Sequence, residues 1–449
     1  MTILKRVLLS IFPGSGKPIN EQKGSRKYFR SLLLHFRPQT VSERTLRFSL
    51  TWGLGGMAAV LIFLLFCTGL MLKFVYVPLP DRAYESILHL QNNIPFGQLV
   101  RNIHHWSANI LLVIVFLHFL RVFFTGAFTA PRQFNWIIGL ALFGGVILSN
   151  FTGYLLPWDQ LSYWAITISS SMLEYIPLVG PKFEELILGG KELGPATIAN
   201  FYAIHTAVLP AVLLLVLPFH FWRIRKANGL VIPRSPDEDP DRLREKIEAI
   251  PNLIVREMTV ALVLLAAVLL ISMLFNAPLG DKANPGLSPN PTKAPWYFMG
   301  FQEMLMHFHP LYSLVIIPLL TVLFLLAIPY ITYGKEISGV WFISKKGRKL
   351  ALASAVASAL LTALGILLLE YVIDFASLLP SLPAAVSNGL IPFILDLLVL
   401  AGLYIFIRKE YSASNQEMVQ AVFVFLVTSF VILTITGVWF RGVGMKLMF

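Results

Sequence analysis

The sequence contains few charged residues, a single cysteine and no tandem repeat or low-complexity tract. Charged residues make up 13% of its 449 residues, which is about half the fraction usual in a soluble globular domain. Together with 56% hydrophobic residues and a mean hydropathy of +0.71, this excludes a soluble protein and indicates an integral membrane protein. The lone Cys67 excludes an intrachain disulfide, a CxxCH haem attachment and any cysteine-ligated cluster or zinc site.

Long apolar segments, by contrast, are abundant. Crossing the hydrocarbon takes about 20 apolar residues, and a crossing segment should be helical because lipid offers no hydrogen-bond partners. The loop 157–199 is polar enough to lie outside the membrane and is expected to hold short surface helices. The sequence therefore predicts an all-α transmembrane bundle of nine spans, at 49–76, 101–124, 135–156, 200–222, 257–276, 311–331, 350–371, 389–407 and 417–439.

Lysine and arginine are distributed unevenly between the two sides of this bundle. If the N-terminus is cytoplasmic, 27 of the 36 basic residues lie inside and 9 lie outside. Such a bias predicts a multi-pass membrane protein with that orientation, its N-terminus in the cytoplasm. It also explains the net charge of +12, so no nucleic-acid partner is inferred. The first twelve residues are expected to form either a helix on the inner leaflet or a disordered tail.

Four of the nine histidines lie within two predicted spans. His104 and His118 are 14 residues apart, and His205 and His220 are 15 apart. At 100° per residue these intervals rotate the second histidine by −40° and +60°, so each pair stays on one helix face, about 21–22 Å apart along the axis. Because both spans run inward, one histidine of each pair lies at an outer level and the other at an inner level.

Facing histidines can supply both axial ligands of a haem iron. The spacing therefore predicts two haems, one held by His104 and His205 at the outer level and one by His118 and His220 at the inner level. Each histidine is thus a candidate metal ligand. The alternative is four buried histidines that bond to backbone carbonyls.

Glycines repeat the interval in the neighbouring spans. Gly55 and Gly69 are 14 residues apart, and so are Gly139 and Gly153. A flat macrocycle between helices needs neighbours without side chains, and glycine allows such an approach. Ordinary packing of small residues between helices would give the same pattern.

Two arginines flank the histidines of the second span. Arg101 precedes His104 by three residues and Arg121 follows His118 by three, so each lies one turn nearer a membrane surface. These guanidinium groups could pair with anionic haem propionates. Arginines that simply extend to the interface are the alternative.

Three stretches carry a family resemblance. They read RNIHHWSANILLVIVFLHFLRVFFTGAFTAPR, NFTGYLLPWDQLSYWA and NFYAIHTAVLPAVLLLVLPFHFWRIRKANG. They resemble cytochrome b of quinol:cytochrome oxidoreductases, and the 15-residue histidine step resembles the b6 branch. The resemblance covers about residues 45–228, and residues 257–332 resemble more loosely the subunit IV of that branch. The ninth span exceeds the family's usual eight.

The resemblance implies four regions. These are a cytoplasmic N-terminal segment with a possible surface helix (1–48), a b6-like four-helix di-haem domain (49–228), a cytoplasmic linker (229–256) and a subunit IV-like membrane domain (257–449).

The resemblance also implies an activity. Quinol, either menaquinol or ubiquinol, is oxidised at an outer site and quinone is reduced at an inner site. One electron leaves to a Rieske iron–sulfur protein or c-type cytochrome subunit, and the other crosses two non-covalent haems b. The result is a proton gradient made by a complex that is usually dimeric, and the expected location is a bacterial cytoplasmic (inner) membrane.

Two departures from the family pattern affect this expectation. The P-E-W-Y signature appears as Ala294-Pro295-Trp296-Tyr297, so a proline replaces the glutamate that is thought to accept a quinol proton. Glu303 is the first candidate to replace it as a base, with Asp159 as a weaker one, and Tyr297 of the signature is retained. The helix cysteine that attaches a third, covalent haem in the b6 branch is Gly53 here, so no covalent haem is expected.

Two other classes remain open. A haem-bearing membrane anchor would connect the quinone pool to a dehydrogenase or multihaem cytochrome without splitting the two electrons of quinol. The missing glutamate favours it. A transporter with proton-relaying histidines is the third class, and the matched spacings and flanking arginines argue against it.

Overall fold

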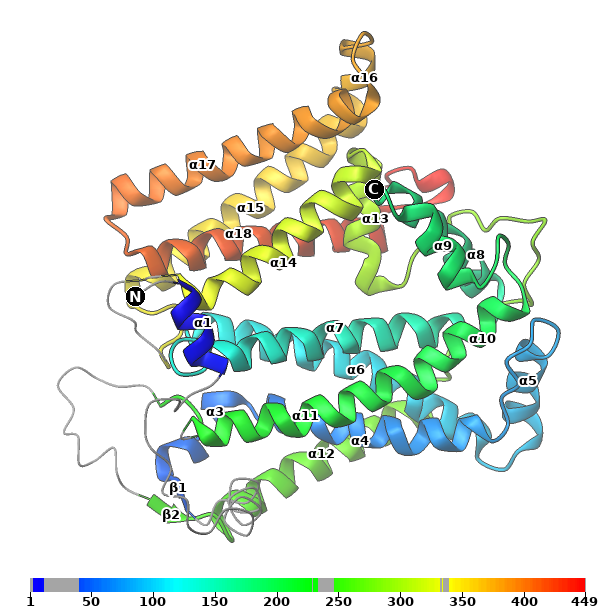
Figure 1. Cartoon of the computed structure of the whole chain (residues 1–449), viewed down its shortest axis with the longest axis horizontal. Helices are drawn as coiled ribbons and strands as arrows, with labels where there is room; N and C mark the ends of the chain where they lie inside the picture. The colour runs from blue at the N-terminus through cyan, green and yellow to red at the C-terminus, as the bar shows by residue number, and fades with distance from the viewer. Residues whose placement is uncertain are drawn as a thin grey trace.

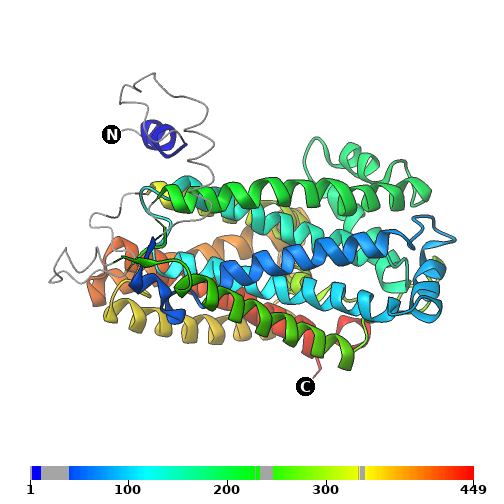
Figure 2. The same cartoon turned by 90° about the horizontal axis from the view of Figure 1, so that it is seen from below.

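The computed structural model describes residues 3–11, 40–227, 229–232, 246–331, 333 and 339–448. Helices make up most of the described residues, and their one β-sheet is an antiparallel ribbon in which β1 (Thr40–Ser42) pairs with β2 (Lys246–Glu248). Nine of the described helices are long and apolar enough to cross a membrane, which confirms the all-α bundle expected from the sequence. Figure 2 shows these helices running side by side in one general direction.

The nine spans are Leu54–Lys73 (α4), Gly97–Phe124 (α6), Gln133–Leu155 (α7), Pro195–Lys226 (α10, Pro195–Ala203, and α11, Leu209–Lys226), Asn252–Leu274 (α12), Leu311–Tyr330 (with α14, Ile317–Ala327), Lys345–Tyr371 (α15), Val386–Tyr411 (with α17, Ile391–Tyr411) and Asn415–Phe440 (with α18, Asn415–Ile435). Shorter helices connect them: α5 (Ala83–Asn93), α8 (Gln160–Ser171), α9 (Gly180–Leu188), α13 (Met299–His307) and α16 (Phe375–Leu378). The helices α8 and α9 confirm the expectation for the loop 157–199, whereas α5 was not anticipated.

The first span begins later than the sequence suggested. A four-residue helix α3 (Phe48–Thr51) is separated from α4 by Trp52 and Gly53, whose φ angles of 51° and 65° are left-handed. Left-handed residues cannot continue a right-handed helix, so the predicted span 49–76 is broken at its start. It also ends three residues early, at Lys73.

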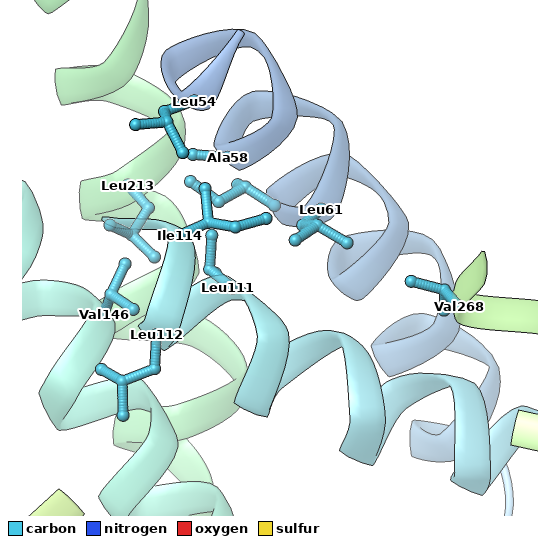
Figure 3. Packing of buried hydrophobic residues seen from close by; sticks show 10 residues of the cluster. Leu54, Ala58, Leu61, Leu111, Leu112, Ile114, Val146, Leu213 and Val268 are labelled. Carbon is cyan, nitrogen blue, oxygen red and sulfur yellow. The ribbon is translucent and has the colours of Figure 1, made fainter. Parts of the chain in front are cut away.

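The spans form two groups, which Figure 1 shows one above the other. In the first group, α4, α6, α7 and α11 enclose a core that includes Leu61, Leu111, Val146 and Leu213 (Figure 3). Because lipid tails are as apolar as these side chains, van der Waals packing between them, rather than removal from water, holds the helices together. Val268 of α12 joins this core, and Asn102 Nδ2 donates to Ser272 O at 2.8 Å.

Packing therefore places α12 with the first four spans, although the sequence assigned it to the region 257–449. The second group contains α14, α15, α17 and α18. In it Ser358 Oγ on α15 donates to Phe425 O on α18 at 2.6 Å.

The N-terminal residues that the structure describes form a helix, α1 (Ile3–Ile11). Its Ser10 Oγ lies 3.2 Å from Tyr330 Oη, and Arg223 Nη1 donates to Ile11 O at 3.3 Å. The helical alternative for the first residues is thus confirmed, and its place on the inner leaflet stays a prediction. Most of the predicted segment 1–48 and part of the linker 229–256 lie outside the described residues.

Candidate functional site

The two outer histidines face each other across the first group of spans. The ring centroids of His104, on α6, and His205, between α10 and α11, are 6.2 Å apart with ring planes at 76°. A ring nitrogen binds a metal ion at about 2 Å and lies about 1.2 Å from its own ring centre, so two imidazoles on one ion have centroids about 6.4 Å apart. The observed spacing fits one metal ion between the rings.

No further protein ligand is positioned to complete such a site. Within the described residues, no group of three or more His, Cys, Asp or Glu side chains could hold a metal ion. An ion between His104 and His205 would therefore have two protein ligands, and its remaining ligands must come with it. A metallated macrocycle such as haem meets that requirement, because it leaves two axial positions for histidine.

Threonines fix the rings of the outer pair. Thr68 Oγ1 lies 2.9 Å from His104 Nδ1, and Thr152 Oγ1 lies 3.1 Å from His205 Nδ1. If each Nδ1–H donates to its threonine, each Nε2 keeps the lone pair that binds a metal. Sequence reasoning missed both threonines. Their signal was a Thr-Gly dipeptide, which occurs at 68–69 and again at 152–153.

Each glycine of the repeated interval faces one histidine. A Cβ added at Gly69 or Gly153 would lie 3.3 or 2.6 Å from Cε1 of His104 or His205. At the inner level, a Cβ on Gly55 or Gly139 would lie 3.5 or 3.4 Å from Cε1 of His118 or His220. The structure thus pairs all four predicted glycines with all four predicted histidines, and the space that each glycine leaves is taken by an imidazole.

Gly153→Ala should disturb the outer level selectively. The new Cβ would lie 2.6 Å from His205 Cε1 and 3.1 Å from Nε2, so the ring must move from its position opposite His104. We expect at least half of the haem predicted for this level to be lost, as measured by a pyridine haemochrome assay. Gly144→Ala on the same helix is the control, because its Cβ would meet nothing within 4 Å. Equal haem content in the two variants would contradict this role of Gly153.

The inner histidines are buried without a protein hydrogen bond at one ring nitrogen. Among the described residues, neither His118 Nδ1 nor His220 Nδ1 has a partner. The residues before their glycines are Leu54 and Ile138, so this level lacks the threonines of the outer one. The two levels therefore differ in how firmly the imidazoles are oriented.

A π-turn modifies the 15-residue step. Residues Ile204–Val208 form a π-helix, in which each hydrogen bond spans one residue more than in an α-helix. The wider turn absorbs part of the extra residue, so His220 is rotated by less than the +60° expected for an unbroken helix. The assumption of an unbroken helix was wrong, but both histidines still lie against glycines of α7.

The two arginines differ in their partners. Arg101 is buried, and its Nη1 and Nη2 donate to Ala277 O at 2.8 Å and to Pro278 O at 2.6 Å. Arg121 is also buried, and its Nε donates to Leu50 O at 3.1 Å, but its Nη2 has no partner among the described residues. Arg121 therefore retains a donor for an anionic group at the inner level, whereas two donors of Arg101 are already used on the backbone.

A cavity of about 1080 Å³, called the outer cavity below, adjoins the outer histidines. His104 and His205 line one part of it, and Asp159, Trp296 and Tyr297 line another. Its volume exceeds the range of about 300–1,000 Å³ usual for one small-molecule ligand. The outer histidine pair and two of the three predicted quinol-site residues thus share one space.

Tyr297 carries an unpaired polar group in the outer cavity. Its Oη is buried and has no hydrogen-bond partner among the described residues. Burial, and then the neighbouring Tyr154, raises the pKa of Tyr297, so the hydroxyl keeps its proton. A buried donor without a partner is costly unless a ligand satisfies it. Tyr297 is therefore well placed to donate to an oxygen of a ligand.

Asp159 connects α8 to the loop between α12 and α13. Its Oδ1 accepts hydrogen bonds from Ser162 N at 2.9 Å and Ser162 Oγ at 2.8 Å, and its Oδ2 accepts one from Gly280 N at 2.8 Å. The bond from Ser162 N caps the N-terminus of α8. Asp159 is thus the carboxylate in the wall of the outer cavity, held in place by three donors.

The structure corrects the expectation for Glu303, which does not line the outer cavity. Its fully buried carboxylate accepts hydrogen bonds from Arg441 Nη2 at 2.6 Å and Arg441 Nε at 3.0 Å, with His307 Nε2 at 3.1 Å. Burial alone would raise the pKa of Glu303, but the bonds from His307 and Arg441 outweigh it and lower the pKa. A general base must lie within reach of the proton that it takes, and this buried carboxylate is not among the residues that line the outer cavity.

Fold and site define a class of protein, a polytopic membrane bundle with one pair of facing histidines and, at a second level, two further histidines that lie against glycines. Comparison with known proteins then identifies the family. The family described as Cytochrome b/b6/petB matches residues 41–228. The menaquinol:cytochrome c reductase cytochrome b subunit of Geobacillus thermodenitrificans is 38% identical over 209 residues, covering 46% of this chain and 93% of that protein. The chain belongs to the cytochrome b/b6 family, which implies haem b and membrane electron transfer.

Other relatives agree with this assignment. Cytochrome b6 of Prochlorothrix hollandica is 43% identical and that of Heliomicrobium gestii is 42% identical. Each match spans 173 residues, which is 38% of this chain, 78% of the first relative and 81% of the second. A structure titled Hyperthermophilic respiratory Complex III is similar with a TM-score of 0.62 at 22% identity, covering 93% of this chain and 98% of the other. That likeness concerns the fold, and it extends well beyond the share of the chain that these sequence relatives match.

Proposed function

We propose that this chain is the di-haem cytochrome b subunit of a quinol:cytochrome c reductase-type complex, which oxidises quinol at an outer site and reduces quinone at an inner site. The observation that carries the proposal is the His104–His205 pair, 6.2 Å apart, in one cavity with the unpaired hydroxyl of Tyr297. The printed name of the Geobacillus relative, a menaquinol:cytochrome c reductase subunit, supports it.

The residues of the chain hold and orient the cofactor. Bound haem b supplies one-electron oxidation and reduction. His104 and His205 would hold the outer haem, with Thr68 and Thr152 accepting their Nδ1–H bonds. His118 and His220 would hold the inner haem, where the free Nη2 of Arg121 offers a charge-assisted bond to a propionate.

The outer cavity has groups for both the ring oxygens and the protons of a quinol. The hydroxyl of Tyr297 would donate a hydrogen bond to a ring oxygen and so orient the substrate. Oxidation releases two electrons and two protons, and Asp159 is the carboxylate in the cavity wall that could take up a proton. With one electron passed to an external acceptor and the other to the inner side, protons leave outside and are consumed inside.

Several further features belong to the proposal. The two haems are bound without covalent attachment, and the quinone is menaquinone or ubiquinone. The N-terminus lies in the cytoplasm, and the acceptor is a Rieske iron–sulfur protein or a c-type cytochrome subunit of a dimeric complex. Residues 49–228 form the di-haem domain and residues 257–449 a subunit IV-like domain, with α12 packed against the former.

A membrane anchor that connects the quinone pool to another redox protein is the second candidate. It is favoured by Pro295, which stands where the family has a glutamate, and by Glu303, which is bound by Arg441 rather than facing the outer cavity. In such an anchor both electrons of a quinol would enter the haems, and no external acceptor would be required.

The state of the external acceptor separates the two functions. In the purified complex with its inner site inhibited, quinol should reduce haem b fast when the acceptor is oxidised and at least about tenfold more slowly when it is pre-reduced. The reason is that the two electrons of quinol take different routes at the outer site, and the haem can receive one only when the external acceptor can receive the other. Equal rates in stopped-flow spectra would favour the anchor.

A pyridine haemochrome assay should give two haems per chain, all extracted by acidic acetone. Haem retained on the chain after extraction would contradict non-covalent binding.

Tyr297→Phe should slow quinol oxidation about tenfold while haem content stays unchanged. The substitution removes only the hydroxyl that lacks a partner in the outer cavity. Loss of one positioned donor weakens the bound substrate by about 1–1.5 kcal/mol, which corresponds to about tenfold in rate. The measurement is quinol-dependent haem reduction in membranes. Tyr312→Phe, a buried tyrosine in the second group of spans, is the control, and equal rates in both variants would remove Tyr297 from the site.

A further inference from the structure

One charged side chain lies deep within a span. In the nine spans, all of which the structure describes, every lysine and arginine lies within four residues of a span end, and every acidic residue but one within five. The exception is Asp396, ten residues from the start of Val386–Tyr411 and 15 from its end. At 1.5 Å per residue it lies about 15 Å and 22 Å from the two ends of the helix.

Asp396 is exposed on a helix segment that the rest of the chain leaves uncovered. All six residues 394–399 are exposed, and they include Leu398 at 61%. The same helix is buried nearer its ends, at Pro392 and at Ile407. Figure 1 shows α17 along one edge of the second group of spans.

No group of the described chain satisfies the carboxyl. Asp396 has neither a hydrogen bond nor an ion pair with the described residues. Ionisable groups at membrane depth are expensive, and where they occur they pair with another polar group. An exposed carboxyl surrounded by lipid on every side would keep this penalty. Since all nine spans are described and none of them supplies a partner at this depth, we look for one in another molecule.

We propose that Asp396 is the docking point for a transmembrane helix of a different polypeptide, which carries a lysine or arginine at the same depth. Charge complementarity selects this occupant, because only a cation both neutralises the carboxylate and donates to it. Cationic lipid headgroups lie at the membrane surface and do not reach this depth. A second copy of this chain does not fit either, since its own spans carry lysine and arginine only near their ends.

Photo-crosslinking in the intact complex tests the proposal. Benzoylphenylalanine is placed at Val399, which is 60° from Asp396 around the helix, or at Leu398, 160° away on the opposite side. Both positions are exposed. After illumination in native membranes, the tagged full-length chain is purified and the crosslinked peptide is identified by mass spectrometry. Subunit composition and crosslinking need no quinol turnover, so this test can fail or succeed independently of the proposed function.

The proposal expects a crosslink from Val399 to a membrane-spanning peptide of another polypeptide with a lysine or arginine at mid-span, at least tenfold stronger than from Leu398. Adding Asp396→Leu should reduce it at least tenfold, because a buried cation would lose its partner, whereas Leu395→Ala should leave it unchanged. Restoration by Asp396→Lys combined with an aspartate in place of the partner's basic residue would establish the pair. Crosslinks to lipid alone, to a second copy or to a helix without a basic residue would each overturn the proposal.

Discussion

Replacing His104 by leucine is expected to remove the outer haem and to leave the inner haem in place. In the proposed function His104 and His205 would hold the outer haem, so the variant would take away one of its two histidines, and leucine cannot bind iron. The inner histidines are about 21 Å away along the helix and lie against their own glycines, Gly55 and Gly139, so nothing at that level changes. Haem content should fall to about half, and one of two components should vanish from a redox titration followed by absorbance.

The reciprocal variant makes the prediction specific. His118→Leu should remove the other spectral component, and His205→Leu should reproduce the loss seen for His104. His105→Leu is the control on the same helix, because its ring makes an edge-to-face contact with Trp106 and is not part of the pair formed by His104 and His205. Loss of the same component from His104→Leu and His118→Leu would show that the two levels are assigned wrongly. Quinol oxidation should cease in every variant that lacks a haem, since electrons could then no longer cross.

The positions of the histidines were predictable because helix geometry converts sequence spacing directly into depth and direction. An interval of 14 residues fixes both quantities within one helix. The glycines of the neighbouring spans are also 14 residues apart, so each of them lies at the depth of one histidine. Thr68 and Thr152 escaped notice although their signal is equally local, a threonine directly before the second glycine of each interval. The role of each threonine depends on a histidine of another helix, and the sequence of one helix does not show which residues face it.

The π-turns also had a local signal. Three of them, Ile204–Val208, Leu311–Ile316 and Val386–Leu390, are each followed two residues after their end by a proline. Proline lacks the N–H that an α-helix needs at that point and collides with the carbonyl four residues earlier, so the preceding turn widens. A periodicity that assumes 3.6 residues per turn does not contain this effect, which is why the rotation of His220 was overestimated.

The environment of Glu303 could not be predicted from the sequence. Its partner Arg441 is 138 residues further along the chain, at the end of the ninth span, and no local pattern connects the two. An acid among apolar residues near Tyr297 therefore suggested a catalytic base. The contact with Arg441, which the sequence does not reveal, instead makes Glu303 part of a buried ion pair. The same contact indicates a structural role for the ninth span, whose end holds the segment that leads to the outer cavity.

Arg441 is the centre of that contact. Besides its bonds to Glu303, its Nη1 donates to Glu370 Oε2 at 2.9 Å, and its side chain is fully buried. Nearby, Lys293 Nζ donates to Val438 O at 2.9 Å. Glu303 and Lys293 lie on either side of Trp296–Tyr297, so the end of the last span fixes both flanks of the residues that line the outer cavity.

Arg441→Met should therefore both destabilise the protein and impair the outer site. Removing one partner of a buried ion pair leaves the other charge uncompensated and costs about 3–5 kcal/mol. We expect thermal inactivation in a fixed detergent to be at least about tenfold faster, and quinol oxidation to fall at temperatures where both haems are retained. Lys446→Met is the control, because it removes a cation from the same terminal segment that is not part of this ion pair.

The double variant Arg441→Met, Glu303→Met distinguishes an ion pair needed for stability from a carboxylate needed for catalysis. The double variant removes the two fully buried members of this contact and leaves without its cation only Glu370, whose side chain is 21% exposed. It should therefore be more stable than Arg441→Met alone, in which the buried carboxylate of Glu303 is also uncompensated. It should also recover most of the quinol oxidation rate, because the loop is held again by packing. If stability returned while oxidation stayed at least about tenfold below that of the unmodified protein, Glu303 would have a part in the chemistry after all. Recovery of both would assign it to the support of Tyr297 and leave Asp159 as the carboxylate available to a quinol.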